Sequence, residues 1–95
     1  MKQYQIQATK QYKKDYKHLV KGGLDTTKLE HVIDLLAAGE KLSGRYRDHA
    51  LQGRLKNTRE CHIGPDWLLR YAKDKDLLVL ILLGTGDHRR VLRVE

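Results

Sequence analysis

The sequence predicts an α+β fold in which a small antiparallel sheet has an N-terminal strand and a two-helix hairpin packed on one face. Three observations support this class. Apolar residues alternate over residues 3–8, recur at helical spacing up to residue 37, and alternate again in short stretches after residue 54. Because 95 residues are enough for one compact core, we expect a single domain over residues 1–95.

The first half of the chain predicts one strand and two helices. The stretch "QYQIQA" at residues 3–8 has the alternation of a half-buried strand. A lysine-rich amphipathic helix follows and ends at Gly22-Gly23, since glycine readily adopts the left-handed conformation after a last turn. Thr27 and Glu30 fit a capping box for a second helix, which Gly39 stops. The short link between the helices implies a helical hairpin.

The second half predicts an ordered loop and then strands. Residues 40–53 have no clean period and predict a loop with a short helical turn. From Arg54 a strand places Cys61 and Ile63 on one face, and Glu60 and His62 on the other. After turn residues at 64–66, "WLLRYAK" predicts the next strand.

The last part of the chain contains the most apolar stretch. The segment "LLVLILL" at residues 77–83 predicts a third strand, which we expect to be central and covered on both sides because it is apolar on both faces. The segment "RRVLRVE" at residues 89–95 is a candidate for a last short strand. The expected order is therefore β-α-α-β-β-β, and residues 89–95 are a candidate for one more strand at the end.

Charge points to an anionic partner. Nineteen Lys and Arg residues against twelve Asp and Glu give a net charge of +7 and a pI near 9.7. A small basic domain of this kind favours a polyanion, most often nucleic acid, although simple solubility is the alternative explanation. The single cysteine, Cys61, excludes an internal disulfide and a site of several cysteines. No stretch is apolar and long enough for a signal peptide or a bilayer span, so we expect a cytoplasmic protein without a membrane partner.

Three of the five histidines lie near the ends of predicted elements. They are His49, His62 and His88, and Asp66 follows Pro65 in the turn between two strands. Metal-independent RNA cleavage needs a base for the ribose 2′-hydroxyl, an acid for the leaving oxygen, and cations for the phosphate. Histidine suits the first two roles and arginine the third. The arginines in the same segments are Arg45, Arg47, Arg54, Arg59, Arg89 and Arg90.

Each of these residues also has an ordinary structural explanation. A histidine near a strand end is more often exposed or hydrogen-bonded than catalytic, an aspartate after proline is a favoured turn residue, and a lone tryptophan usually belongs to the core. Zinc binding by His49, His62, His88 and Asp66 is a further alternative. The ligands are scattered and the arginines oppose a cation, so we expect neither a metal site nor another cofactor.

Two segments resemble the YafQ branch of the RelE/ParE superfamily of type II toxins. They are "YRDHALQGRLKNTRECHIGPDWLLRY" at residues 46–71 and "LLGTGDH" at residues 82–88. The family pattern has a Tyr-(Lys/Arg)-Asp-His-x-Leu-x-Gly block, then an Arg-(Glu/Asp)-x-His-x-x-Pro-Asp-Trp block, and then an Arg-Thr-Gly-x-His block. The blocks follow in the same order and at matching spacing here, and the predicted order of elements also matches the family fold.

The resemblance implies a toxin that cleaves messenger RNA in the ribosomal A site and thereby inhibits translation. It also implies a cognate antitoxin with an acidic binding segment, and contact with operator DNA only through that antitoxin. The family's functional residues fall on His49, His62, Asp66 and His88, and Trp67 matches its tryptophan. We expect His88 as acid or phosphate-side partner, His62 and Asp66 in base and positioning roles, and His49 in support. Arg59 and the nearby arginines are expected to hold phosphates, and Trp67 to stack on a base of the RNA or to pack beneath the site.

Two positions depart from the family pattern. In the last block "LGTG" replaces the usual Arg-Thr-Gly, with Leu83 where an arginine is common. Leu92 stands where the family usually has an aromatic residue, and the chain contains no phenylalanine. Leucine cannot stack on a base as an aromatic ring does. Two alternatives therefore stay open on the same fold: a non-catalytic regulatory module that binds RNA or DNA, and a ParE-like gyrase inhibitor. The three histidines argue against the inhibitor, which has no need of an acid–base set.

Overall fold

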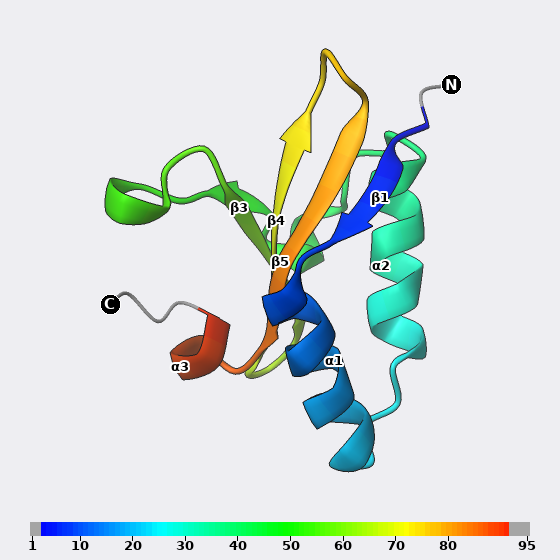
Figure 1. The fold of residues 1–95 in the computed structure, drawn as a ribbon, viewed down its shortest axis with the longest axis vertical. Helices are drawn as coiled ribbons and strands as arrows, with labels where there is room; N and C mark the ends of the chain where they lie inside the picture. The colour runs from blue at the N-terminus through cyan, green and yellow to red at the C-terminus, as the bar shows by residue number, and fades with distance from the viewer. Residues whose placement is uncertain (1–2, 92–95) are drawn as a thin grey trace.

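A computed structural model describes residues 3–91 and has a five-stranded sheet in the order β1-β5-β4-β3-β2 (Figure 1). The predicted α+β class is confirmed. The elements in chain order are β1 (Gln5–Ala8), α1 (Lys10–Lys21), α2 (Thr27–Ala37), η1 (Gly44–Tyr46), β2 (His49–Ala50), η2 (Gly53–Leu55), β3 (Arg59–Gly64), β4 (Trp67–Asp74), β5 (Val79–Gly86) and α3 (His88–Val91).

The two long helices begin at threonines. The Thr9 hydroxyl accepts a hydrogen bond of 3.2 Å from the Tyr12 amide and caps α1. Helix α2 follows Thr26, whose side chain makes no cap hydrogen bond, so the predicted capping box of Thr27 and Glu30 is wrong. The Glu30 carboxylate instead accepts hydrogen bonds of 3.0 Å from the hydroxyls of Thr26 and Tyr16. Glu30 therefore links α2 to α1.

Strands β2 to β5 pair antiparallel, as predicted, whereas β1 pairs with β5 in parallel. No hairpin joins β1 to its neighbour, because two helices and three strands lie between them in the chain. The direction of β1 is therefore set by long-range packing and not by a turn. In the β4–β5 pair, Leu68 lies opposite Gly86, which brings the end of β5 beside the start of β4.

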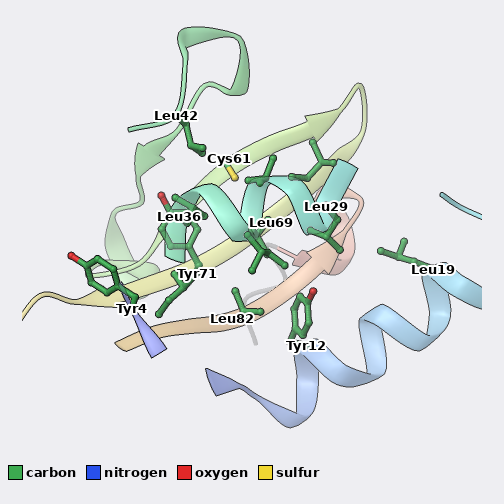
Figure 2. Close-up of a cluster of buried hydrophobic side chains, with 14 residues drawn as sticks. Tyr4, Tyr12, Leu19, Leu29, Leu36, Leu42, Cys61, Leu69, Tyr71 and Leu82 are labelled. Carbon is green, nitrogen blue, oxygen red and sulfur yellow. The ribbon is translucent and has the colours of Figure 1, made fainter. Parts of the chain in front are cut away.

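Both helices cover the same face of the sheet (Figure 2). Leu29 and Leu36 from α2 pack against Leu69 and Tyr71 from β4, and all four side chains are fully or almost fully buried. Tyr12 and Leu19 of α1 belong to the same cluster. Burial of these apolar side chains is the main favourable contribution to folding.

Strand β5 has apolar side chains on both faces, but only the face that packs against the helices is fully buried. Leu80 and Leu82 are buried in the core, whereas Ile81 and Leu83 on the opposite face are only partly buried. The expectation that this strand is covered on both sides is therefore wrong, because the two long helices pack on one side. None of the helices within residues 3–91 is long and apolar enough to cross a membrane.

Three predicted boundaries also change. The strand expected from Arg54 begins at Arg59, because η2 and a turn with Asn57 at a φ of 72° occupy the residues before it. Strand β5 continues to Gly86 instead of ending at residue 83. Residues 89–91 lie in α3 and not in a strand, since the Asp87 carboxylate accepts a hydrogen bond of 2.9 Å from the Arg90 amide and starts a helical turn. The remainder of that predicted strand, residues 92–95, lies outside the described residues.

Leu69→Ala tests the contribution of the core. Leu69 is fully buried at the centre of the sheet, so this change should lower the free energy of unfolding by about 2–5 kcal/mol. Leu77→Ala is the matched control, because the Leu77 side chain is 74% exposed and its loss should have little effect. Urea denaturation of both variants measures the difference, and equal midpoints would contradict the assignment of the core.

Candidate active site

The turn at residues 65–66 and helix α3 meet at the end of the sheet where β4 begins and β5 ends. Nδ1 of His88 lies 2.8 Å from Oδ1 of Asp66, and the His88 amide donates to the same oxygen at 3.3 Å. His88 is the first residue of α3, so its backbone amide has no partner within that helix. The carboxylate of Asp66 therefore holds both the backbone and the ring of His88.

Three histidine rings lie in a row at this end of the sheet. The ring centroids of His62 and His88 are 5.9 Å apart, and those of His62 and His49 are 6.2 Å apart. His62 belongs to β3, and His49 belongs to β2, where it pairs with Glu60 of β3. The structure thus brings together all three histidines and the aspartate that the sequence singles out.

Glu60 is a member of this cluster that the sequence analysis did not single out as functional. It is 5% exposed, and its Oε2 lies 3.1 Å from Nε2 of His49 and 3.9 Å from Nε2 of His62. Its other oxygen, Oε1, is buried without a hydrogen-bond partner among the residues that the structure describes. The available signal was strand alternation, which placed Glu60 and His62 on one face of β3.

His62 and His88 have different surroundings. The His62 side chain is only 13% exposed, and burial, followed by the positive charge of Arg47, lowers its pKa. A lowered pKa keeps this imidazole neutral at neutral pH, as a proton acceptor requires. The His88 side chain is 51% exposed, and its hydrogen bonds lower the pKa of Asp66. Asp66 is therefore a carboxylate that accepts from Nδ1–H of His88 and leaves Nε2 as the nitrogen for exchange with a substrate.

Arg47 is the predicted phosphate-binding arginine that contacts the histidine row. Its Nη2 lies 3.4 Å from Nδ1 of His62. Its φ of 48° is in the left-handed region that non-glycine residues seldom adopt, and such strain is typically held at functional sites. A hollow of about 310 Å³ beside it is lined by Lys28, Arg45, Arg47, Tyr46, His62, Ile63, Gly64 and Pro65.

The other predicted arginines lie in different surroundings. Arg45 stacks on Tyr46 with 4.9 Å between its guanidinium carbon and the ring centroid. Arg59 lies on the opposite face of β3 from His62 and pairs with Asp48 at 3.3 Å. Arg89 is exposed on α3 and Arg54 is exposed on η2. The guanidinium of Arg90 lies 3.4 Å from the Asp15 carboxylate.

Trp67 is partly buried beside this corner. Its indole N–H donates a hydrogen bond of 3.0 Å to the hydroxyl of Thr85 on the neighbouring strand. The edge of the ring that carries the N–H therefore points toward Thr85, and the indole packs against the core and lies close to Gly64, just before the turn that holds Asp66. Leu92, where the family has an aromatic residue, lies outside the described residues.

The metal-ligand set in the structure differs from the set that the sequence suggested. Ligand atoms of His49, Glu60 and His62 lie within 4.8 Å of one another, and this is the group that the described residues offer. The sequence analysis had weighed His88 and Asp66 in place of Glu60. Two imidazoles and a carboxylate are a donor set that fits zinc or copper, although the nearby Arg47 opposes a cation.

Almost the whole chain matches a family of known proteins. A family described as the bacterial toxin of type II toxin–antitoxin systems, YafQ, matches residues 4–93. The chain belongs to the YafQ family. Within that family it is 38% identical to the mRNA interferase toxin YafQ of Escherichia coli K12 over 86 residues, which are 90% of this chain and 94% of that protein. These matches confirm the YafQ-family resemblance that the sequence motifs suggested.

Solved structures of YafQ toxins and similar toxins have the same fold. A metal-bound toxin from Helicobacter pylori superposes with a TM-score of 0.86 at 41% identity, covering 93% of this chain and 98% of that one. YafQ in the E. coli DinJ–YafQ toxin–antitoxin complex superposes with a TM-score of 0.82 at 37% identity, covering 90% of this chain and 93% of that one. The family and the fold thus agree with the sequence-based predictions.

Arg47→Ala tests the electrostatics of the histidine row. Loss of the adjacent positive charge should raise the pKa of His62 from its lowered value toward that of an ordinary histidine, because Arg47 is one cause of the shift. A pH titration of the His62 ring signals by NMR measures this change. Lys14→Ala is the control, since it removes the same charge from an exposed position on α1. Equal His62 titrations in the two variants would contradict the assignment.

Proposed function

We propose that this YafQ-family protein is an endoribonuclease that cleaves messenger RNA in the A site of the ribosome and inhibits translation. The observation that carries the proposal is the row His49–His62–His88, with a hydrogen-bonded Asp66 behind His88. Such a row supplies both a base and an acid within reach of one phosphate. The relatives named mRNA interferase toxin support the same reaction class.

In the proposed reaction His62 is the base. Its pKa is lowered by burial and by Arg47, so its ring is neutral at neutral pH. It takes the proton of the ribose 2′-hydroxyl as that oxygen attacks the adjacent phosphorus in line. The attack forms a 2′,3′-cyclic phosphate and breaks the bond from phosphorus to the 5′-oxygen. Glu60, 3.9 Å from the His62 ring, stabilises the imidazolium that results.

His88 is the acid in this scheme. Asp66 accepts from Nδ1–H at 2.8 Å, which leaves Nε2 without a contact to Asp66 and available to a substrate. An imidazolium held in this way donates its Nε2 proton to the departing 5′-oxygen. The products are a cyclic phosphate, or the 3′-phosphate formed from it by water, and a 5′-hydroxyl. His49 supports the base through its contact with Glu60 at 3.1 Å.

Cationic side chains next to the histidines hold the phosphate backbone. Arg47 contacts His62, and Arg45 lines the same hollow. Guanidinium groups suit phosphate oxygens because they donate two parallel hydrogen bonds. Trp67 supports the turn beneath the site. The phosphate roles of Arg54, Arg59, Arg89 and Arg90 stay predictions, and Arg59 lies on the face of β3 away from the histidines.

The net charge of +7 fits a protein that acts on the ribosome, which is a polyanionic surface. It also fits neutralisation by an antitoxin with an acidic segment that covers the basic face or adds a strand at a sheet edge. The E. coli DinJ–YafQ structure is a toxin–antitoxin complex. In this proposal operator DNA is contacted only through the antitoxin, and the protein acts in the cytoplasm where ribosomes translate.

His62→Ala and His88→Ala test the reaction. Each should lower the cleavage rate by roughly 10²–10⁴-fold, since each removes one partner of an acid–base pair. The assay is mapping of RNA 5′ ends after incubation with ribosomes that carry messenger RNA. His31→Ala is the matched control, because His31 is exposed on α2. Full cleavage by both site variants would exclude the scheme, and binding without cleavage by the wild type would favour a non-catalytic module.

A divalent metal is a second candidate ligand of the same cluster. His49, Glu60 and His62 offer the donors, and the buried Oε1 of Glu60 has no hydrogen-bond partner among the described residues. One solved relative is a metal-bound toxin. Metal ligation requires neutral imidazoles and occupies their lone pairs, so His62 no longer accepts a proton when the site is filled. The metal would therefore inhibit the nuclease.

Adding and removing metal distinguishes an inhibitory metal site from a catalytic one. We expect cleavage at the full rate with a zinc-selective chelator in a buffer that retains Mg²⁺ for the ribosome. Added Zn²⁺ or Cu²⁺ should slow cleavage. Glu60→Gln should weaken that inhibition, because a neutral amide is a poorer ligand than a carboxylate. Loss of activity with the chelator, restored by Zn²⁺, would contradict an inhibitory site.

A further inference from the structure

Asp15 is an ionisable residue on the buried side of α1. It lies between Tyr12 and Leu19 on the stripe that packs against the sheet, and it is fully buried. A charge in that position is expensive unless it is paired and hydrogen-bonded. The sequence carried a signal for it, since an aspartate at the helical spacing of an apolar face is unusual.

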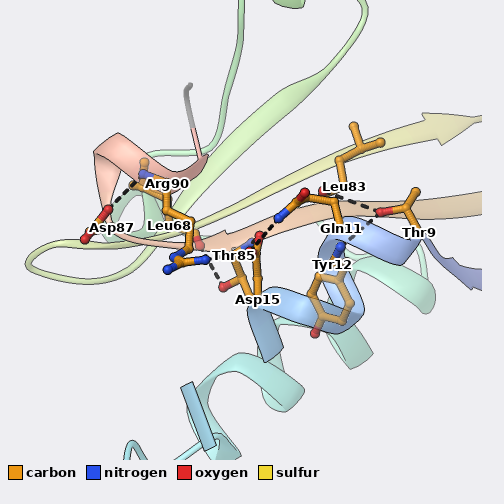
Figure 3. Close-up of polar contacts among 9 residues, drawn as sticks. All are labelled: Thr9, Gln11, Tyr12, Asp15, Leu68, Leu83, Thr85, Asp87 and Arg90. Atoms are coloured by element: carbon orange, nitrogen blue, oxygen red, sulfur yellow. Dashed lines mark hydrogen bonds and ion pairs between the residues drawn. The ribbon is translucent and has the colours of Figure 1, made fainter. Parts of the chain in front are cut away.

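The partners of Asp15 come from three segments (Figure 3). Oδ1 accepts a hydrogen bond of 2.9 Å from Nε2 of Gln11 on the preceding helical turn. Nη1 of Arg90, on α3, lies 3.4 Å from the same oxygen. Oδ2 accepts a hydrogen bond of 3.2 Å from the backbone amide of Thr85 on β5. One carboxylate thus joins the long helix, the end of the last strand and the short helix that begins with His88.

Thr85 extends the contact toward Trp67. Its buried hydroxyl donates a hydrogen bond of 2.8 Å to the Leu68 carbonyl and accepts one of 3.0 Å from the Trp67 indole. The backbone amide of Thr85 therefore binds Asp15, while the Thr85 hydroxyl binds Trp67, the residue that follows Asp66. The same network lies under both partners of the Asp66–His88 pair.

The glycines on either side of Thr85 leave room for this arrangement. A Cβ at Gly84 would lie 3.1 Å from Oδ2 of Asp15, closer than most such contacts. A Cβ at Gly86 would lie 2.9 Å from Cδ of Arg90, and the φ of 140° at Gly86 is disfavoured for other residues. The segment Gly84-Thr85-Gly86 is therefore shaped around the carboxylate of Asp15 and the side chain of Arg90.

We propose that Asp15 is a positioning residue for His88, acting through Arg90 on α3 and through Thr85 at the end of β5. The inference rests on the proposed ribonuclease function. It assigns Arg90 to the orientation of α3 and not to the phosphate. Helix α3 spans only four residues within the described chain, so its own hydrogen bonds hold it weakly and it needs external contacts. Small misplacement of a catalytic group has a large effect on rate.

Stability alone is a weak explanation for the buried carboxylate of Asp15, because well-packed apolar side chains often stabilise a fold as well. A charged, hydrogen-bonded group differs from an apolar one in directionality. It defines where the Arg90 guanidinium and the Thr85 amide must lie. The neighbours of Asp15 are thus held at distances that a leucine in its place could not specify.

Asp15→Asn is the first test, because it keeps the size of the side chain and removes its charge. The expected result is a fall of about 10²-fold in kcat for cleavage of ribosome-bound messenger RNA, with KM little changed. The limb of the pH–rate profile that reports His88 should move as well, since the ring no longer keeps its place beside Asp66. Asp34→Asn, at an exposed position on α2, controls for the change in net charge.

A second readout does not depend on activity. The NMR signals of the His88 ring should shift in Asp15→Asn, whereas those of His31 should not. Arg90→Lys keeps a cation near Asp15 and should retain more activity than Arg90→Ala. The double variant Asp15→Asn/Arg90→Ala should cleave no more slowly than the less active of the two single variants, as expected for residues that act through one contact.

The outcomes distinguish this inference from the proposed function. If the wild type does not cleave RNA, the proposed function fails, and the His88 signals still test whether Asp15 positions that ring. If the wild type cleaves and Asp15→Asn matches Asp34→Asn in kcat, pH profile and His88 signals, the positioning role is overturned. If Asp15→Asn does not fold, the activities of Arg90→Lys and Arg90→Ala test the inference instead. Equal activity of these two variants would overturn the positioning role of the Asp15–Arg90 contact.

Discussion

Leu68 lies opposite Gly86 in the antiparallel register of β4 and β5, and this pairing sets the distance between the 65–66 turn and α3. A strand that slips by one residue turns all its side chains to the other face. Such a slip would separate Asp66 from His88, whose contact of 2.8 Å depends on the two strand ends meeting. The apolar core on the helix-covered face holds the register, so the packing of Leu69 and Tyr71 is also what assembles the site.

The environments of the histidines, more than their identities, separate their roles. His62 is largely buried beside Arg47, whereas half of the His88 side chain is exposed and faces a carboxylate. Groups of one chemical type can take different roles in one site when their surroundings differ. Glu60 adds a buried negative charge beneath His49 and His62. In the proposed reaction this carboxylate stabilises a protonated ring, and together with the two imidazoles it forms a donor set that fits a metal ion.

Strand alternation divides the charged residues into two groups. On one face of β3, Glu60 and His62 belong to the site, while on the other face Arg59 pairs with Asp48, which also accepts a hydrogen bond of 2.6 Å from the Tyr71 hydroxyl. Arg90 likewise lies beside a buried carboxylate on α1. A positive net charge therefore does not identify the residues that meet RNA. In this fold some arginines are tied to acidic partners inside the structure, and Arg47 lies with the histidines.

Local patterns in the sequence were sufficient to predict the α+β class, the two helices and the face of β3 that carries His62, because these features depend on neighbouring residues. The places of His49, His62, His88 and Asp66 near the ends of predicted elements singled them out, and the family blocks implied their roles. Only the tertiary structure decided that β1 runs parallel to β5, that residues 89–91 are helical, that Glu60 lies beside His49, and that Asp15 lies beside Arg90. These features depend on contacts between distant positions, such as the Thr85 amide and Asp15, which lie 70 residues apart. Such contacts form only when the whole core packs, and periodicity along the chain carries no record of them.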